Sequence, residues 1–149
     1  MSEPTGPPIL VVEDSPEDYE TTVRAFRRAG LRNPMHHCTT GDEALDFLHR
    51  RGPFEAPAEA PRPAIILLDL NLPGTDGRTV LHEIKHARQL SGIPVVVLTT
   101  STDRRDVDAC YAAGANSYVH KPVDLERFMR AIQRLSDYWF DVVILPKDA

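Results

Sequence analysis

The sequence predicts an α/β domain in which helices cover both faces of a parallel β-sheet. Five short runs rich in valine, isoleucine and leucine alternate with five segments of helical spacing, as in parallel sheets whose strands are joined by helical crossovers. The strongest runs are apolar throughout rather than at every second position, which indicates strands buried on both faces. A length of 149 residues with 42% hydrophobic residues is enough for one domain with its own core.

The predicted strands are short and differ in strength. Ile9–Val12 is continuous and β-branched, whereas Met35–Cys38 is a weak second strand. Residues 64–68 form the strongest run, and the last two strands are predicted at 94–98 and 115–119. The order of these strands within the sheet does not follow from the pattern itself.

The predicted helices begin and end at recognisable signals. Pro16 lies in the first turn of the first helix, where acidic residues favour the positive end of the dipole, and Gly30 ends it. In the last helix, apolar residues recur at three- and four-residue steps, so one face is expected to pack on the sheet. The helices are predicted at residues 16–29, 41–50, 76–88, 103–113 and 124–140.

Residues 9–140 are therefore predicted to form one domain. Residues 1–8 are a polar, proline-rich lead that we expect to be disordered. Residues 52–63 hold four prolines and are expected to be a loop. Residues 141–149 form a tail whose apolar run is expected either to fold back on its own core or to dock on a second copy.

Charge and composition exclude several classes of protein. The net charge of -5 argues against a nucleic-acid binder, which depends on a basic surface to neutralise phosphates. No apolar stretch approaches the roughly 18 residues that a membrane span needs, and the first residues lack the features of a signal peptide. Cys38 and Cys110 form no CxxC pair, which favours a reducing compartment. We therefore expect a cytoplasmic protein without direct membrane or nucleic-acid contact.

Reactive side chains follow four of the five predicted strands. Glu13 and Asp14 follow the first strand, Asp69 the third, Thr99 the fourth and Lys121 comes shortly after the fifth. Ligands of open α/β sheets bind beyond the carboxyl ends of the strands, so these residues are expected to share one edge. Crowded carboxylates need a compensating cation, and Mg²⁺ prefers oxygen ligands. A metal ion, an ammonium and a hydroxyl around Asp69 would stabilise a phosphoryl group transferring to its carboxylate.

These motifs resemble the receiver domain of two-component response regulators. The resemblance rests on Glu13-Asp14, on Asp69-Leu-Asn-Leu-Pro-Gly, on Val-Leu-Thr99 and on Lys121-Pro122, and it covers roughly residues 9–135. It implies a flavodoxin-like, doubly wound five-stranded sheet of order 2-1-3-4-5. It also implies a phosphoacceptor switch rather than an enzyme, with only self-phosphorylation from a donor and slow self-dephosphorylation.

The resemblance implies a metal site at the acidic residues. Asp69 is the expected phosphoacceptor. Together with Glu13, Asp14 and the backbone carbonyl of Asn71, it is expected to hold Mg²⁺ or Mn²⁺.

The remaining roles concern the phosphoryl group and the switch. Thr99 and Lys121 are expected to bind the phosphoryl oxygens. Tyr118 matches the family's aromatic residue that turns inward when the threonine moves. One position departs from the pattern: Thr100 stands where such proteins usually have a very small residue. Its bulk is expected to restrict small phosphodonors or hydrolytic water.

The insertion before the third strand and the ending over residues 138–146 resemble small regulators paired with bacterial and cyanobacterial phytochromes. This implies a sensor histidine kinase, linked to a phytochrome, as the partner. It also favours a symmetric homodimer through the fourth helix, the fifth strand, the fifth helix and the tail. The alternative is a receiver-like binding or scaffold module that is not phosphorylated.

Three other motifs point elsewhere and carry less weight. His82-Glu-Ile-Lys-His86 spells the HExxH pattern of zinc proteases, but no third ligand accompanies it. Asn71 stands where aspartyl-phosphate phosphatases have their second aspartate, so it cannot serve as a general acid. The turn after the first strand is acidic and lacks glycine, which excludes a pyrophosphate-binding loop.

Overall fold

A computed structural model of the chain describes residues 6–56, 60–142 and 144–146. Its strands are β1 (Ile9–Val12), β2 (Met35–Cys38), β3 (Ile65–Leu68), β4 (Val95–Thr99) and β5 (Ser117–His120). Its α-helices are α1 (Pro16–Arg28), α2 (Gly41–His49), α3 (Gly77–His86), α4 (Arg104–Ala112) and α5 (Leu125–Ser136). Among the described residues, no helix combines the length and the apolar character that crossing a membrane requires.

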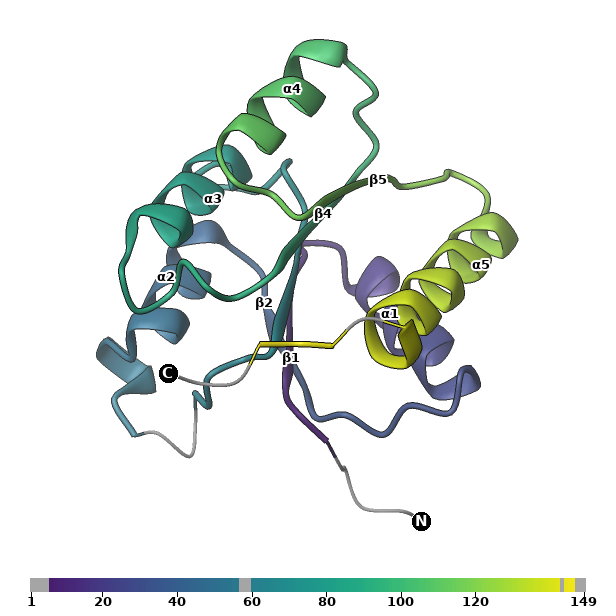
Figure 1. The fold of residues 1–149 in the computed structure, drawn as a ribbon, viewed down its shortest axis with the longest axis horizontal. Helices are drawn as coiled ribbons and strands as arrows, with labels where there is room; N and C mark the ends of the chain where they lie inside the picture. The colour runs from purple at the N-terminus through teal and green to yellow at the C-terminus, as the bar shows by residue number, and fades with distance from the viewer. Residues whose placement is uncertain (1–5, 57–59, 143, 147–149) are drawn as a thin grey trace.

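The five strands form one parallel sheet in the order β2-β1-β3-β4-β5 (Figure 1). This confirms both the predicted parallel sheet and the order that the receiver resemblance implies. In the register of the sheet, Val12 pairs with Cys38 on one side and with Leu68 on the other. The carboxyl ends of β1 and β3 are therefore level, and the residues that follow them are neighbours.

Each face of the sheet carries its own apolar core. Figure 1 shows α1 and α5 on one face and α2, α3 and α4 on the other. Successive strand residues point to opposite faces. The core under α1 and α5 receives Ile9, Val11, Ile65, Leu67, Val96 and Leu98. The other core receives Leu10, Val12, Ile66, Leu68, Val95 and Val97. Burial on both faces explains why β1 and β3 are apolar at every position, and why β4 is apolar up to Thr99.

Polar side chains cap the first turn of every α-helix. Ser15 and Thr40 accept a hydrogen bond from a backbone N–H of α1 and α2, respectively. Asp76, Asp103 and Asp124 do the same for α3, α4 and α5. Such caps satisfy backbone donors that have no partner inside the helix. They also explain why these three helices begin one residue later than predicted, since the aspartates are caps.

Two segments differ from the sequence prediction. A short 3₁₀ helix, η1 (Gly52–Phe54), lies within the predicted loop, and the ring of Phe54 packs against Phe47 with centroids 5.3 Å apart. The last helix continues as a π-helix, η2 (Asp137–Val142). There Trp139 is buried in the core under α1 and α5. In both places, an apolar contact stabilises a backbone conformation that local sequence signals did not predict.

Described residues of both terminal segments contact the domain. The backbone carbonyls of Pro7 and Pro8 accept hydrogen bonds from Asn33 and from the backbone of Ala64. In the tail, Leu145 packs against the core under α1 and α5, whereas Ile144 is 94% exposed. The other parts of the predicted lead and tail, at residues 1–5, 143 and 147–149, lie outside the described residues.

Candidate functional site

The carboxyl edge of the sheet brings together the residues that sequence analysis placed at strand ends. Glu13, Asp69, Thr99 and Lys121 are all buried there, and Asp14 beside them is exposed. Their burial is unusual, because charged side chains are seldom buried without partners. Neighbouring groups at this edge must therefore neutralise the charges of the buried side chains.

Lys121 supplies that compensation in the structure. Its Nζ lies 2.5 Å from Glu13 Oε1, 2.8 Å from Asp18 Oδ2 and 3.2 Å from Asp69 Oδ2. The same Nζ lies over the ring of Phe128, 5.9 Å from the ring centroid. One ammonium group is thus shared by three carboxylates from three separate segments of the chain.

Asp18 is a partner that sequence reasoning missed. Its position in the first turn of α1 suggested only a favourable interaction with the helix dipole. In the structure, α1 begins at Pro16, directly beyond the edge, so its first turn lies over the same pocket as Glu13. The short distance in sequence between Asp18 and the acidic pair was the only signal available.

The charges of this cluster shift the pKa of its members. Burial raises the pKa of Glu13 to about 7, even though the hydrogen bond to Lys121 acts in the opposite direction. Burial alone would lower the pKa of Lys121, but the hydrogen bonds to Asp18 and Glu13 and the charge of Asp69 raise it above the ordinary value. Lys121 is therefore a permanent cation, and the carboxylates remain crowded around it.

The acidic residues of the edge fit a divalent cation. Glu13, Asp14 and Asp69 each offer a carboxylate oxygen, and these oxygens all lie within 4.8 Å of one another. Oxygen donors at such spacing match the preference of Mg²⁺ for one or two carboxylates together with water and phosphate oxygens. The Asn71 N–H donates to Asp69 Oδ1 at 3.0 Å and so orients this carboxylate. The backbone carbonyl of Asn71 as a metal ligand stays a prediction.

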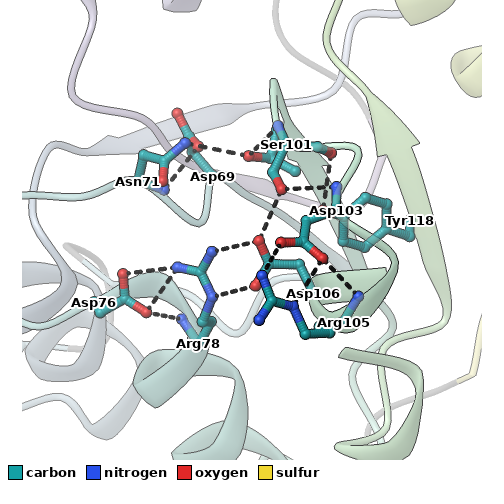
Figure 2. Close-up of polar contacts among 10 residues, drawn as sticks. Asp69, Asn71, Asp76, Arg78, Ser101, Asp103, Arg105, Asp106 and Tyr118 are labelled. Atoms are coloured by element: carbon teal, nitrogen blue, oxygen red, sulfur yellow. Dashed lines mark hydrogen bonds and ion pairs between the residues drawn. The ribbon is translucent and has the colours of Figure 1, made fainter. Parts of the chain in front are cut away.

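Thr99 lies at the other side of Asp69 and is fully buried. Its Oγ1 accepts long hydrogen bonds, 3.4 Å each, from Asn71 Nδ2 and from the Ser101 N–H. Tyr118 is only partly buried, and its hydroxyl donates to the Ser101 carbonyl at 3.0 Å (Figure 2). The predicted switch pair is therefore connected through the backbone of Ser101.

The HExxH motif at residues 82–86 does not lie in a buried cluster of this kind. His82 and His86 are both exposed on α3 and stack on each other with ring centroids 3.8 Å apart. Over the part of the chain that the structure describes, Glu13, Asp14 and Asp69 are the one group of three or more potential ligands close enough to hold a metal ion.

Comparison with known proteins shows to which family this fold and site belong. Residues 9–133, most of the chain, match the response regulator receiver domain family. The chain therefore belongs to the response regulator receiver family.

Several relatives are similar over their whole length. Response regulator Rcp1 of Synechocystis is 40% identical over 148 residues, which covers 98% of this chain and 99% of Rcp1. The crystal structure of Mn²⁺-bound Rcp1 matches with a TM-score of 0.90, covering 95% of this chain and 100% of that one at 39% identity.

Two solved structures of phytochrome response regulators are also similar. The phosphorylated cyanobacterial phytochrome response regulator RcpA has a TM-score of 0.89 at 34% identity, covering 96% of this chain and all of its own. The bacteriophytochrome response regulator RtBRR has a TM-score of 0.74 at 41% identity, covering 97% of this chain and 85% of its own.

Family membership confirms the broad functional prediction. The protein is a two-component response regulator receiver, a member of a family of phosphoacceptor switches rather than typical enzymes, and such receivers accept a phosphoryl group from a histidine kinase. Receiver domains bind Mg²⁺ or Mn²⁺ at an acidic pocket, which agrees with the acidic cluster at this edge, and the cofactor prediction is confirmed.

Mg²⁺ is expected to stabilise the folded chain through this cluster. A ligand that binds only the native state adds about 2.7 kcal/mol at a concentration 100 times its Kd. We expect Asp14→Asn to abolish most of this gain at the same Mg²⁺ concentration, because the exposed Asp14 belongs to the cluster and its loss does not disturb the core. Thermal unfolding against Mg²⁺ concentration measures the effect. Asp108→Asn, exposed on α4, is the control, and a wild-type protein insensitive to Mg²⁺ would contradict the prediction.

Proposed function

We propose that Asp69 is the phosphoacceptor and that the surrounding residues serve its phosphorylation. The observation that carries the proposal is the buried ammonium of Lys121, 3.2 Å from Asp69 Oδ2, within a cluster of carboxylates. A scaffold that is never phosphorylated gains nothing from burying these charges, since buried ion pairs are at best a weak source of stability. The same cluster can stabilise a phosphoryl group, which brings negative charge to the edge.

The transfer is an in-line displacement at phosphorus. A carboxylate oxygen of Asp69 forms a bond to phosphorus as the bond from phosphorus to the kinase histidine nitrogen breaks. The electron pair of that bond stays on the imidazole. We propose that Lys121 then turns from Asp69 to a phosphoryl oxygen, and that the Thr99 hydroxyl donates to another. A bound Mg²⁺, held by Glu13, Asp14 and Asp69, supplies positive charge that offsets the charge of the transferring group.

The switch would act by shifting an existing equilibrium between two surface conformations. We propose that the Tyr118 side chain moves when Thr99 moves, because both residues contact Ser101. The partly buried ring of Tyr118 packs at the edge of the core under α2, α3 and α4. It is thus placed to move between more and less buried positions as the threonine hydroxyl is recruited to the phosphoryl group.

Phosphorylation of the intact protein tests the proposal. The protein is incubated with Mg²⁺ and acetyl phosphate, or with a phytochrome-linked histidine kinase and ATP, and then weighed by mass spectrometry. We expect the mass of one phosphoryl group to be added in the wild type and to be absent in Asp69→Asn. Asp108→Asn, exposed on α4, is the control and should be phosphorylated. A wild-type protein that stays unmodified with both donors would overturn the proposal.

The phytochrome link of the kinase rests on the relatives. RcpA and RtBRR are by name phytochrome response regulators, and their similarity extends over nearly the whole of this chain. We therefore propose a phytochrome-linked sensor histidine kinase as the donor. We also propose a cytoplasmic location with neither membrane nor direct nucleic-acid contact, and the net charge of -5 supports the last of these points. Slow self-dephosphorylation and phosphorylation from small donors belong to the same proposal.

A homodimer through α4, β5, α5 and the tail is the proposed arrangement of the regulator. Apolar side chains are exposed on three of these segments, namely Tyr111 on α4, Leu125 on α5 and Ile144 in the tail. Ile144 is 94% exposed although its neighbour Leu145 packs on the core. An exposed isoleucine in a segment that is itself anchored favours a contact with a second copy.

Ile144→Glu is expected to weaken this dimer about tenfold, because a buried anchor at an interface is worth more than about 1 kcal/mol. Sedimentation equilibrium measures the change. His82→Glu, exposed on α3 outside the proposed interface, is the control. The point change is a cleaner test than removing the tail after Asp137, because that truncation also deletes the buried Trp139. An unchanged dimer would exclude Ile144 from the interface.

A further inference from the structure

Ser101 connects three elements of the structure through its three polar groups. Its backbone N–H donates to Thr99 Oγ1 at 3.4 Å, and its carbonyl accepts from the Tyr118 hydroxyl at 3.0 Å. Its side-chain hydroxyl donates to Asp106 Oδ2 at 2.7 Å (Figure 2). The Thr99 hydroxyl is therefore linked through Ser101 to Asp106 of α4.

Asp106 is itself held by a second helix. Arg78 of α3 donates to both of its carboxylate oxygens, from Nε at 2.9 Å and from Nη2 at 2.8 Å. A two-bond pair of this kind is stronger and more directional than a single ion pair. The Asp106 side chain is 23% exposed, so water only partly screens the interaction. Hydrogen bonds from Arg78 and Ser101 lower the pKa of Asp106 to about 2, so this carboxylate stays charged at every physiological pH.

The Arg78 guanidinium also contacts the N-cap residue of its own helix. Arg78 Nη1 lies 3.1 Å from both carboxylate oxygens of Asp76, and Asp76 is the N-cap of α3 (Figure 2). Asp76 thereby limits the rotamers of Arg78 and directs its other face toward Asp106. The result is a rigid connection from the start of α3, through α4, to the segment that follows Thr99.

We propose that Arg78 and Asp106 are positioning residues that hold Thr99 in its unphosphorylated place by acting through the Ser101 hydroxyl. The proposal rests on phosphorylation at Asp69. In the structure, Thr99 Oγ1 accepts hydrogen bonds from Ser101 and Asn71. A shift of Thr99 toward a phosphoryl group on Asp69 pulls Ser101 along and strains its bond to Asp106. The connection therefore opposes the switch, and its removal should favour the phosphorylated conformation.

A neighbouring ion pair offers a matched control. Arg105 Nη2 lies 2.9 Å from Asp103 Oδ2 on the same side of the molecule, at the start of α4. Its side chain is 92% exposed, and its hydrogen bonds are all with Asp103, two residues away. Loss of Arg105 removes the same kind of side chain from the first turn of a helix, here α4, and breaks no hydrogen bond to Arg78, Ser101 or Asp106.

The test compares Arg78→Ala, Ser101→Ala, the double variant and Arg105→Ala. With acetyl phosphate or phosphoramidate and Mg²⁺, we expect roughly fivefold faster phosphorylation in Arg78→Ala, within the range typical of residues that modulate a switch. Ser101→Ala should give a similar increase, and Arg78→Ala should add nothing to it, because two residues acting through one contact are not additive. Arg105→Ala should behave as the wild type.

Amide hydrogen exchange of the unphosphorylated proteins provides a second readout. The Ser101 N–H should exchange about fivefold faster in Arg78→Ala and at the wild-type rate in Arg105→Ala. A merely structural role would lower stability without changing this amide selectively. Equal exchange in both variants, or equal acceleration of phosphorylation by Arg78→Ala with and without the Ser101 hydroxyl, would overturn the inference. A wild-type protein that accepts no phosphoryl group would instead contradict the proposed function, and the exchange result would still decide whether Arg78 holds Ser101.

Discussion

Lys121→Met is expected to lower the free energy of unfolding by about 3 kcal/mol in buffer without divalent cations. The change keeps most of the apolar stem but removes the ammonium that Glu13, Asp18 and Asp69 share. Two of these carboxylates are buried, so their repulsion and their lost solvation are no longer offset. Phosphorylation should also slow about a hundredfold, as is typical when a charge-stabilising donor is removed from a reaction site. Urea unfolding and phosphorylation kinetics measure the two effects.

Added Mg²⁺ should restore part of the stability lost in Lys121→Met, because the metal ion offsets the same carboxylates. A second change, Glu13→Gln in the Lys121→Met background, should also restore part of it, since one buried charge is removed. Lys85→Met is the control. The Lys85 ammonium bonds to the neutral acceptors Ser91 O, Ile93 O and Asn116 Oδ1. Its loss should be insensitive to Mg²⁺. A Lys121→Met protein as stable as the wild type in EDTA would show that the cluster needs no ammonium.

Gly77→Ala is expected to destabilise the fold by about 3 kcal/mol, the upper range for overpacking of a buried site. A methyl group on Gly77 would lie 2.4 Å from the Asp69 carbonyl oxygen and 2.5 Å from Leu70 Cα. Both atoms belong to the backbone that carries the proposed phosphoacceptor, so neither can turn aside as a side chain would. Either α3 or the Asp69 segment must move.

Because the clash involves the Asp69 segment, phosphorylation should slow together with the loss of stability. Gly92→Ala is the matched control, since a methyl group there meets no atom within 4 Å. Its stability should be unchanged or slightly higher, because alanine restricts the unfolded chain. Urea unfolding of both variants checks the prediction. Equal stability of the two would mean that α3 tolerates a shift away from Asp69.

The secondary structure could be predicted because its signals are local. The apolar runs of β1, β3 and β4 are continuous because both of their faces are buried. The ends of α1 to α5 carry capping and turn residues that act within a few positions of themselves. The strand order, by contrast, came from the resemblance to receivers, because periodicity within a strand says nothing about which strand lies beside it.

The clustering of the candidate site could also be predicted, because it depends on one rule of parallel sheets. Glu13, Asp69, Thr99 and Lys121 each lie at or just beyond the end of a strand, and the carboxyl ends of parallel strands share an edge. Knowledge of where each strand ends was therefore enough to bring these residues together. The same rule does not say which of them touch.

Only the tertiary structure decided those contacts. Asp18 as a partner of Lys121 and Arg78 as a partner of Asp106 join segments distant in sequence, and Gly77 lies against the Asp69 backbone only because α3 packs there. They depend on how far each helix is shifted and rotated against the sheet, and on which rotamers that packing permits.

The sequence by itself thus determined the helices and strands, the sheet edge that the site residues share, and the residues capable of phosphoryl chemistry. These features depend on periodicity and on strand ends, which are properties of short stretches of sequence. Helix packing determined which charges share Lys121 and which residues hold Thr99. The physical reason is that a hydrogen bond or ion pair forms or is lost over an ångström or so. Local patterns do not encode the placement of α1 and α3 with that accuracy.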